Sequence, residues 1–341
     1  MSEAVSVGIL GASGYTGAEL LRLAAAHPDL DVRLATADTM SGRRAADLYP
    51  ALELHYPDLV LDAFDPAAAA GLDLVFLGLP HQASMELAPR LVGEVGCVVD
   101  LSAAFRLQDA DAYPAYYGFE HTQPDLLAEA VFGLPELHRD ELRGARLVAT
   151  PGCHVTTATL ALAPLVGAGL VEPTRLIVDT MTGVTGAGRT PSDTNVFANI
   201  DANVTAYGLH HHRHTPEMEQ EIGGQVLFTP HLVPMSRGLL ATAYAMPSGP
   251  VTTDGLRDAQ RRAYADAPFV AVIDRPPATK ALLGSNGVHV SASYDERTGT
   301  VIAMAALDNL TKGAAGGAVH AANVALGLDE TAGLPTVGLQ P

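Results

Sequence analysis

The sequence predicts two domains: an α/β domain with a doubly wound parallel sheet, then an α+β domain with a mixed or antiparallel sheet. Its 341 residues are enough for two domains of ordinary size. In the first third, short apolar runs alternate with helical stretches, which is typical of parallel strands joined by helices. Later strand-like runs follow one another with few helices between them, which indicates a mixed or antiparallel sheet. We expect residues 1–152 to form the first domain, 153–307 the second, and 308–341 to pack back on the first.

The elements of the first domain are predicted by apolar runs and by the residues that interrupt them. Val5–Leu10 is typical of a buried strand, and Ala18–Ala26 of a helix that ends at His27-Pro28, because proline cannot continue a helix. The other elements expected in this domain are strands at Val32–Ala37, Leu72–Leu79, Cys97–Leu101 and Arg146–Thr150 and a helix at Ser84–Val92.

The second domain is expected to open with a helix at Val155–Val166 and to contain another at Thr253–Ala265. Its strands are expected at Arg175–Met181, Val226–Val233, Leu239–Met246, Val288–Tyr294 and Thr300–Ala306. The segment Gly313–Leu328 is rich in alanine and glycine with helical spacing, and it is the part that we expect to return to the first domain.

Composition and charge exclude several classes of protein. Hydrophobic residues make up 48% of the chain, enough for a sizeable core, and the net charge is −18. Surfaces that bind nucleic acids or anionic membranes need clustered Lys and Arg, so we expect neither partner. The N-terminus lacks the pattern of a signal peptide, and no apolar stretch approaches the roughly 18–20 residues of a membrane span. Two cysteines, Cys97 and Cys153, make no disulfide framework, so we expect a cytoplasmic protein.

A glycine-rich turn lies between the first predicted strand and the first predicted helix. It runs Gly11-Ala12-Ser13-Gly14-Tyr15-Thr16-Gly17. Glycines allow a tight turn and a close approach of the backbone to a ligand, and the helix N-terminus offers free N–H groups to a pyrophosphate. The spacing is a variant of the usual pattern, but its position between strand and helix indicates a Rossmann-like site for a dinucleotide.

The loop after the second predicted strand bears on which dinucleotide is bound. NADP sites favour hydroxyls and arginines around the additional phosphate, whereas NAD sites usually place an acid near the end of this strand. Ser41, Arg43 and Arg44 favour NADP(H), while Asp38 leaves NAD open.

Cys153 is the candidate nucleophile. It lies in Thr150-Pro-Gly-Cys153-His, between a predicted strand and a predicted helix. The dipole and free N–H groups of a helix N-terminus stabilise a thiolate, and the same groups can hold a developing oxyanion. Cys97 lies inside an apolar strand and is interpreted as a small buried residue.

A histidine-rich segment, His210-His211-His212-Arg213-His214, offers an acid–base partner for a thiolate. Thr215 as N-cap and Pro216 as first helical residue predict a helix that starts after this segment. A zinc site is the alternative. Because no second Cys/His cluster with ligand spacing accompanies the segment, and adjacent histidines cannot all point one way, we expect no metal.

Arg106 ends the segment Asp100-Leu-Ser-Ala-Ala-Phe-Arg106, just beyond a predicted parallel strand. Ligands collect at the carboxyl ends of such strands. A guanidinium suits bidentate recognition of phosphate, and Ser102 can donate another hydrogen bond. We therefore predict a phosphate site here, with an ordinary surface ion pair of Arg106 as the alternative.

Eight short segments, in the order of the chain, together carry the motifs of one enzyme family. They are Gly11–Leu20, Gly78–His81, Asp100–Arg106, Gly133–Leu137, Pro151–His154, Gly183–Arg189, His212–Glu217 and Asp308–Ala314. Over nearly its whole length the chain thus resembles the N-acetyl-γ-glutamyl-phosphate reductase family, which is related to aspartate-semialdehyde dehydrogenase. Those relatives carry a catalytic histidine in Gly-His-Ser, but the matching stretch here reads Pro234-Met-Ser-Arg237-Gly, which moves the expected base to the earlier histidine segment.

The resemblance implies an NADPH-dependent reductase of arginine biosynthesis. Cys153 would attack the γ-acyl phosphate and release inorganic phosphate, and hydride from NADPH would reduce the resulting thioester to N-acetylglutamate semialdehyde. His212 or His214 would be the acid–base, with His212 preferred although the chemistry does not separate the two, and Glu217 would orient it. The resemblance also implies a homodimer or homotetramer, with residues 153–307 forming the catalytic and oligomerisation domain.

For the ligands, the resemblance implies that Arg106 and Ser102 hold the phosphate group. Asn309 would approach the nicotinamide, and His81 would line the cofactor cleft.

Two other functions are compatible with the sequence. One is the same chemistry on N-acetylaminoadipyl phosphate, or on a carrier-linked form, in lysine synthesis. This substrate is longer by one methylene group, which changes the binding free energy by only about 1–3 kcal/mol, so the sequence does not distinguish the two substrates. The other is a non-catalytic NADPH-binding redox sensor. The combination of Cys153, the histidines and Arg106 argues against a sensor, which needs no phosphate pocket.

Overall fold

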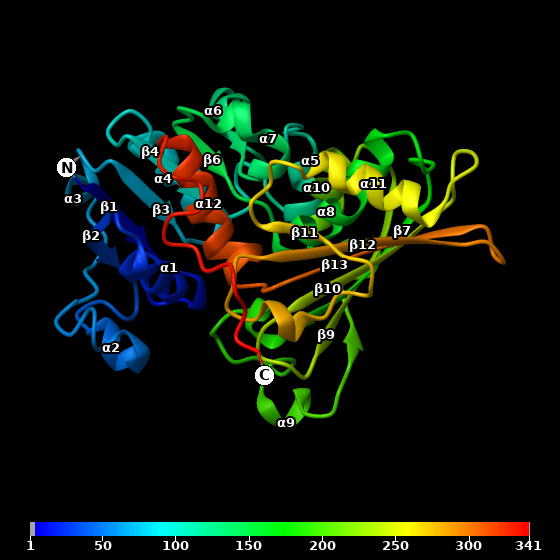
Figure 1. The fold of residues 1–341 in the computed structure, drawn as a ribbon. Coiled ribbons are helices and arrows are strands. Elements are labelled where there is room, and N and C mark those ends of the chain that lie inside the picture. Colours follow the sequence, from blue (N-terminus) through cyan, green and yellow to red (C-terminus); the bar gives the residue numbers. More distant parts are fainter. Residues whose placement is uncertain (1–3, 341) are drawn as a thin grey trace. The chain divides into compact units, whose positions relative to one another are not determined.

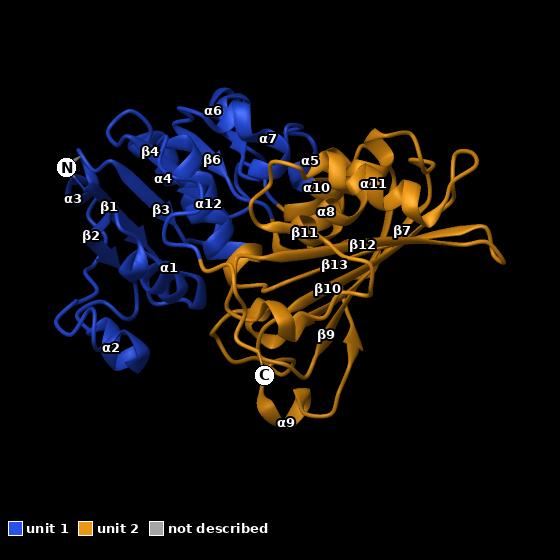
Figure 2. Cartoon of the chain, in the orientation of Figure 1, with its two compact units in different colours: residues 1–114, 119–151, 314–334 blue, residues 115–118, 152–313, 335–341 orange. Residues whose placement is uncertain are grey.

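The structure is a computed structural model that describes residues 4–340 and divides into two compact units (Figure 1, Figure 2). Unit 1 extends to residue 114 and continues with residues 119–151 and 314–334. Unit 2 comprises residues 115–118, 152–313 and the chain from 335 onward. Within residues 4–340, no helix combines the length and the hydropathy of a membrane span.

Unit 1 is built on a six-stranded parallel sheet with strand order β2-β1-β3-β4-β6-β5. The strands are β1 (Val5–Leu10), β2 (Leu30–Thr36), β3 (Leu74–Leu77), β4 (Cys97–Asp100), β5 (Val131–Phe132) and β6 (Leu147–Ala149). From β1 the chain adds β2 on one side and β3 on the other, so the order reverses between β1 and β3. In open α/β sheets such a switch point forms the crevice where ligands bind. The predicted doubly wound parallel sheet is confirmed.

The helices of unit 1 connect these strands and differ in length from those predicted. They are α1 (Tyr15–Ala26), α2 (Ala45–Leu48), α3 (Pro66–Ala69), α4 (His81–Leu91), α6 (Pro124–Glu129) and α7 (Pro135–Leu142), with the 3₁₀ turn η1 (Pro50–Leu52). The helix α5 (Ala112–Tyr117) lies where the two units divide the chain. Helix α1 ends with His27 as C-cap, as the His27-Pro28 pair predicts, and α4 begins three residues earlier than predicted.

The C-terminal helix α12 (Gly316–Ala325) belongs to unit 1 and packs against α1, α7 and β4. Nine of its ten residues are buried, which is the pattern of a helix enclosed on all sides. Asn323 of α12 lies 3.0 Å from His27 Nε2, and both residues are buried. Of residues 308–341, which were predicted to pack back on the first domain, residues 314–334 belong to unit 1. The assignment of functions to the two domains stays a prediction.

Unit 2 is built on a seven-stranded sheet with strand order β11-β12-β13-β10-β7-β9-β8. The strands are β7 (Leu176–Gly183), β8 (Thr205–Ala206), β9 (Val226–Val233), β10 (Leu239–Ala245), β11 (Val270–Val272), β12 (Val288–Asp295) and β13 (Thr300–Leu307). The neighbours β7 and β9 are parallel, as are β11 and β12, and the remaining pairs are antiparallel. The predicted mixed sheet of an α+β domain is therefore confirmed.

One face of this sheet is covered by α8 (Cys153–Gly167), α10 (His214–Ile222) and α11 (Thr253–Ala263), as Figure 1 shows. Side chains alternate along the strands: Leu176, Val178 and Thr180 of β7 are buried, whereas Ile177 and Met181 point to the other face and are exposed. Between β7 and α10 the chain forms a long excursion with the 3₁₀ turn η2 (Val184–Ala187), the short helix α9 (Phe197–Ile200) and β8. After β13 comes a π-helical turn at Thr311–Ala315.

Candidate active site

The candidate nucleophile occupies the first position of a long helix. Helix α8 begins at Cys153, two residues earlier than predicted, and Gly152 is its N-cap. Cys153 is half-buried, so it is accessible, and it lies where the free N–H groups and dipole of the helix favour negative charge. Cys97, in contrast, is 1% exposed in β4, and burial raises its pKa to about 12. The two cysteines differ as their sequence contexts predict.

The turn before Cys153 is packed so tightly that only glycine fits. A Cβ atom added at Gly152 would overlap the ring of His214. A Cβ atom added at Gly313, in the π-helical turn, would lie 2.8 Å from Cβ of Cys153. The nucleophile is thus held between two glycines that are far apart in the sequence.

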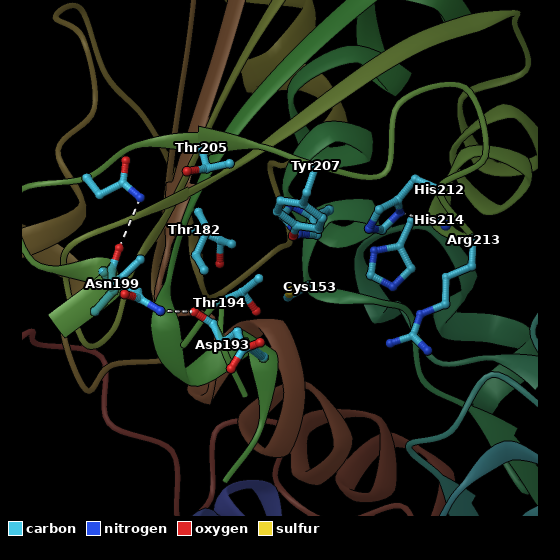
Figure 3. Close-up of a pocket in the computed structure, with 16 residues that line it drawn as sticks. Cys153, Thr182, Asp193, Thr194, Asn199, Thr205, Tyr207, His212, Arg213 and His214 are labelled. Carbon is cyan, nitrogen blue, oxygen red and sulfur yellow. Dashed lines mark hydrogen bonds between the residues drawn. The ribbon is translucent and has the colours of Figure 1, made fainter. Parts of the chain in front are cut away.

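A pocket of about 530 Å³ opens next to Cys153 within unit 2 (Figure 3). Its charged and aromatic lining consists of His154, Tyr207, His212, Arg213 and His214, and the excursion between β7 and α10 supplies the opposite wall. That wall is held by its own hydrogen bonds: Asn199 Nδ2 donates to the Asp193 carbonyl at 2.6 Å, and Asn203 Nδ2 donates to the Asn199 carbonyl at 3.0 Å. The pocket can enclose a small polar substrate beside the thiol.

Three histidines converge in this pocket: His154, His212 and His214 each place a ring nitrogen within 4.8 Å of the others. Not all histidines of the segment point one way, as expected, but the alternate residues His212 and His214 do, and His154 of α8 joins them. His210 and His211 are exposed. Such a cluster can hold a metal ion, but two features disfavour a cation here. Both ring nitrogens of His154 have hydrogen-bond partners. Burial, and then the positive charge of Arg213, lower the pKa values of His154 and His212, so the surroundings disfavour further positive charge.

His212 is a neutral imidazole with a defined tautomer. Burial, and then repulsion from Arg213, lower its pKa to about 4. Its Nδ1 accepts a hydrogen bond from the backbone N–H of His214 at 3.1 Å. Because a neutral imidazole has one donor and one acceptor nitrogen, Nε2 of His212 carries the hydrogen. His212 thus presents a hydrogen-bond donor at neutral pH.

His214 lies in the first turn of α10, contrary to the prediction that a helix starts after it. The helix begins at His214 with Arg213 as N-cap, and Thr215 does not cap it. The reason is local: the N–H of His214 is bound by the His212 ring, and the N–H of Thr215 donates to the His212 carbonyl at 3.0 Å. With these donors satisfied, the helix starts one residue before the expected cap. The buried His214 ring then packs on Gly152, next to the nucleophile.

Glu217, the residue expected to orient the histidine, contacts the nucleophile turn. It is fully buried, and its carboxylate accepts hydrogen bonds from the Tyr117 hydroxyl at 2.6 Å and from the Gly152 N–H at 3.2 Å. A buried carboxylate that accepts from the residue before Cys153 holds the start of α8 in place. Its orienting effect on a histidine stays a prediction.

Asn309 and Arg237 are engaged in the framework of unit 2. Asn309 accepts a hydrogen bond from the Gly238 N–H at 2.7 Å and donates to Thr185 Oγ1 at 3.0 Å. Arg237, in the stretch that lacks the Gly-His-Ser histidine, pairs with the buried Asp308 at 2.9 Å. The placement of Asn309 near a nicotinamide stays a prediction.

In unit 1, the glycine-rich turn has the geometry that the dinucleotide hypothesis requires. Gly11 adopts a φ of +93°, and a Cβ atom added there would overlap the Gly78 carbonyl, while one at Gly17 would lie 2.5 Å from Cα of Ala12. Gly14 caps α1 without a side-chain hydrogen bond, which leaves the backbone N–H groups of its first turn to an anion. These residues fit a pyrophosphate. Ser13 and Thr16 of the turn are half-buried, as is Tyr15.

The residues expected to select NADP lie in the exposed turn after β2. Ser41 and Arg43 are exposed, whereas Arg44 is engaged by Asp47 at 2.7 Å. Asp38, which leaves NAD open, is exposed in the same turn. Arg43 therefore suits the additional phosphate better than Arg44 does.

The predicted phosphate residues and His81 gather at the carboxyl ends of β3 and β4, next to the switch point. His81 Nδ1 accepts a hydrogen bond from the Ala103 N–H at 3.0 Å. Arg106 Nη2 donates to the Leu101 carbonyl at 2.9 Å, and Ser102 Oγ donates to the buried Asp100 carboxylate at 2.7 Å. Burial raises the pKa of Asp100, and Arg106 opposes that shift. All of these residues belong to unit 1, and a phosphate site made by Ser102 and Arg106 stays a prediction.

The sequence reasoning missed His154, Tyr207 and Arg213, which line the pocket. Two of them carried a signal, since His154 directly follows Cys153 and Arg213 separates the two converging histidines. Tyr207 lies in the excursion between β7 and α10, where the sequence has no periodic pattern.

Comparison with protein families gives two matches that together span most of the chain. Residues 6–145 match the semialdehyde dehydrogenase NAD binding domain, and residues 153–309 match the semialdehyde dehydrogenase dimerisation domain.

Curated relatives are similar over nearly their full length. The N-acetyl-gamma-glutamyl-phosphate reductase of Symbiobacterium thermophilum is 46% identical over 98% of this chain and 98% of its own. The protein of the same name from Syntrophobacter fumaroxidans is also 46% identical, over 98% of this chain and 99% of its own.

Solved structures share the fold at low identity. Aspartate semialdehyde dehydrogenase II of Vibrio cholerae, complexed with ASA, is 18% identical with a TM-score of 0.70 over 95% of this chain and 98% of its own. Aspartate semialdehyde dehydrogenase of Candida albicans, solved with NADP, is 16% identical with a TM-score of 0.70 over 94% of this chain and 98% of its own.

Proposed function

Because this chain belongs to the N-acetyl-γ-glutamyl-phosphate reductase family, we propose that it reduces N-acetyl-γ-glutamyl phosphate to N-acetylglutamate semialdehyde with NADPH, a step of arginine biosynthesis. The observation that carries the proposal is Cys153, half-buried at the first position of α8, in a pocket that also contains His212, Arg213 and His214. A thiol at a helix N-terminus with an imidazole in the same pocket is the arrangement that acyl transfer to cysteine requires.

In this proposal Cys153 performs both halves of the reaction. Its thiolate attacks the γ-carbonyl carbon, the bond from that carbon to the phosphate oxygen breaks, and inorganic phosphate leaves a thioester. When bound, NADPH supplies the hydride that reduces the thioester carbon. The carbon–sulfur bond then breaks, which releases the aldehyde and returns the thiolate.

The two candidate histidines take different roles. His214 is the acid–base, since its buried ring packs on Gly152 beside the nucleophile. His212 is a hydrogen-bond donor, since its Nδ1 is occupied by a backbone N–H and its Nε2 therefore carries the hydrogen. Arg213 pairs with the α-carboxylate of the substrate, because a guanidinium binds a carboxylate by two parallel hydrogen bonds.

The residues of unit 1 bind the phosphate and the cofactor in this proposal. Arg106 holds the substrate phosphate, together with Ser102 once its hydroxyl hydrogen turns from Asp100 to the ligand. The Gly11–Gly17 turn holds the pyrophosphate, and Ser41 with Arg43 holds the additional phosphate of NADP. His81 lines the cofactor cleft, and Asn309, a residue of unit 2, approaches the nicotinamide. Because the nucleophile must remain a free thiol, we place the enzyme in the reducing cytoplasm.

The reverse reaction tests the proposed function. Purified protein is mixed with N-acetylglutamate semialdehyde and NADP, with and without inorganic phosphate, and NADPH formation is followed by absorbance. We expect NADPH to form only with phosphate, and more slowly with NAD in place of NADP. If only the one-carbon-longer semialdehyde of N-acetylaminoadipate is oxidised, the substrate would be N-acetylaminoadipyl phosphate. If neither aldehyde is oxidised, the proposal would be overturned.

We also propose that two copies pair through the open face of the unit 2 sheet. Strand register places Leu227, Ile177, Tyr244 and Ile302 in one row across β9, β7, β10 and β13. Of these, Ile177 is 39% and Leu227 53% exposed in the single chain. An apolar sheet face of this kind, in a segment that matches a dimerisation domain, is suited to a second copy of the same face.

Charge on this face is expected to separate the copies. In the variant with Ile177→Glu and Leu227→Glu, the paired face would bury like charges without partners, so the mass in light scattering after size exclusion should fall to that of one chain. Val337→Glu serves as control, since Val337 is 81% exposed outside the sheet, and it should leave the mass unchanged. A double variant that keeps the wild-type mass would place the interface elsewhere.

A further inference from the structure

The pocket contains a hydrogen-bonded chain of three side chains that the proposed reaction does not use: Thr180, His154 and Tyr207. Thr180 Oγ1 lies 2.8 Å from Nδ1 of His154, and Nε2 of His154 lies 3.0 Å from the Tyr207 hydroxyl. Thr180 points inward from β7, His154 is the second residue of α8, and Tyr207 follows β8. The chain therefore runs from the interior of unit 2 to the pocket wall, where Figure 3 shows the Tyr207 ring above Cys153.

The direction of the hydrogen bonds follows from the buried threonine. Thr180 is 0% exposed, and its hydroxyl hydrogen needs an acceptor, which Nδ1 of His154 provides. If instead His154 donated from Nδ1, the buried hydroxyl hydrogen would have no acceptor among the described residues. With Nδ1 as acceptor, Nε2 of His154 carries the ring hydrogen and donates it to the Tyr207 oxygen. The hydrogen of the Tyr207 hydroxyl is then left to point into the pocket.

The charge states of the three groups keep this direction constant. Burial, followed by repulsion from His212 and Arg213, lowers the pKa of His154 to about 3, so the ring is neutral at physiological pH. Burial also raises the pKa of Tyr207, and the charge of Cys153 raises it further, so the phenol keeps its hydrogen. The residue is 36% exposed as a whole, but its hydroxyl end is the part in contact with His154. Cys153 and Tyr207 line the same pocket.

We propose that Tyr207 is a further catalytic residue, which donates a hydrogen bond to the acyl oxygen of the substrate on Cys153, and that His154 and Thr180 are positioning residues for it. The inference rests on the proposed function, because it names the group that stabilises that reaction's oxyanions. When the thiolate attacks, the carbonyl π electrons move to the acyl oxygen, and they return as the bond to phosphate breaks. The same oxygen becomes negative again when hydride reaches the thioester. In both steps Tyr207 keeps its hydrogen, so no proton is transferred.

The first test is Tyr207→Phe, which removes one oxygen atom and keeps the ring. Loss of one preorganised donor to an oxyanion typically lowers kcat by about 10²–10³-fold. We expect a decrease of this size with KM changed by less than about threefold, and an unchanged rate of Cys153 alkylation by iodoacetamide, since the thiol itself is unaffected. A variant with wild-type kcat would overturn the catalytic role.

The second test separates the hydroxyl of Thr180 from its packing. Thr180→Val keeps the shape and removes the hydroxyl, whereas Thr180→Ser keeps the hydroxyl and removes a methyl group. If Thr180 positions the chain, Thr180→Ser should retain most of kcat and Thr180→Val should lose about tenfold or more, because His154 is then free to change tautomer. If Thr180 only packs, the order is reversed, and that order would overturn the positioning role.

The third test reads the tautomer without any turnover. Nitrogen-15 NMR of labelled histidine should show His154 with its hydrogen on Nε2 in the wild type and a shift toward the other tautomer in Thr180→Val. Hydrogen on Nδ1 of His154 in the wild type would overturn the direction of the chain. A protein that shows the expected tautomer but no reductase activity would place the failure in the proposed function, not in this hydrogen-bonded chain.

Discussion

The Cys153→Ser variant is expected to lose the phosphate-dependent reduction of NADP by at least about 10⁴-fold, since a neutral hydroxyl is a far weaker nucleophile than a thiolate. The exchange of sulfur for oxygen at the first position of α8 keeps the helix and its glycine neighbours, so the thermal midpoint should stay within a few degrees of the wild type. Activity is measured in the reverse assay at saturating aldehyde, and folding is monitored by circular dichroism.

Cys97→Ala is the matched control for this variant. Cys97 is 1% exposed in β4, so its truncation leaves a small cavity and lowers stability, but it should leave kcat within about twofold. Intact mass spectrometry adds a direct reading of the intermediate. With aldehyde and NADP but no phosphate, the wild type should gain the mass of an N-acetylglutamyl thioester, and Cys153→Ser should not. Substantial turnover by the serine variant would remove the covalent route.

The second large effect is expected for His214→Asn. General acid–base groups contribute about 10²–10⁴-fold, and the buried ring of His214 against Gly152 is the one best placed to serve the thiol. We expect kcat to fall within that range, with the rate of Cys153 alkylation at neutral pH falling as well, because less thiolate forms. His211→Asn is the control, since His211 is exposed in the same segment, and its kinetics should match the wild type.

The pH profile distinguishes the two histidines. The pKa of His212 is held at about 4 by burial and by Arg213, below the ordinary value of 6.5, so this ring is already neutral at pH 5 and stays neutral as the pH rises. His212→Asn should therefore lower kcat without altering the shape of the profile between about pH 5 and 8. If His212→Asn loses an inflection of the kcat profile in this range and His214→Asn keeps it, His212 would be the acid–base and the proposed roles of the two residues would be wrong.

The regular elements were predictable because their side chains alternate or repeat with a clear period. The strands at Val5–Leu10 and Val226–Val233 have the predicted bounds, and the mixed sheet of unit 2 follows from the succession of strand-like runs. The helices α2 and α9, each of four residues, were not predicted. A helix of one turn is not stable by itself and forms only through its contacts with the surrounding chain. Its own residues therefore show little of the periodic pattern from which a helix can be predicted.

The site was partly predictable. The nucleophile could be found because a cysteine between a strand and a helix has a local meaning, and Cys153 has that position in the structure. The partners of Glu217 could not, since Tyr117 lies 100 residues away in the sequence and the Gly152 contact requires α10 to be packed on α8. The start of α10 was misplaced because the His212 ring accepts the backbone N–H of His214 and so holds the first helical turn one residue before the expected Thr215 cap. Rules for helix ends do not anticipate a ring from the preceding segment.

Helix α12 has a consequence for the synthesis of the chain on the ribosome. It is buried against α1, α7 and β4, yet roughly 160 residues of unit 2 are translated between α7 and α12. Translation proceeds at about 5–20 residues per second, so the surface that α12 covers stays uncovered for on the order of 10–30 seconds before α12 is synthesised. During that time its apolar side chains are available to chaperones that hold nascent chains. Unit 1 is therefore expected to complete its folding only after residues 152–313 of unit 2 have been translated, although most of unit 1 is synthesised before them.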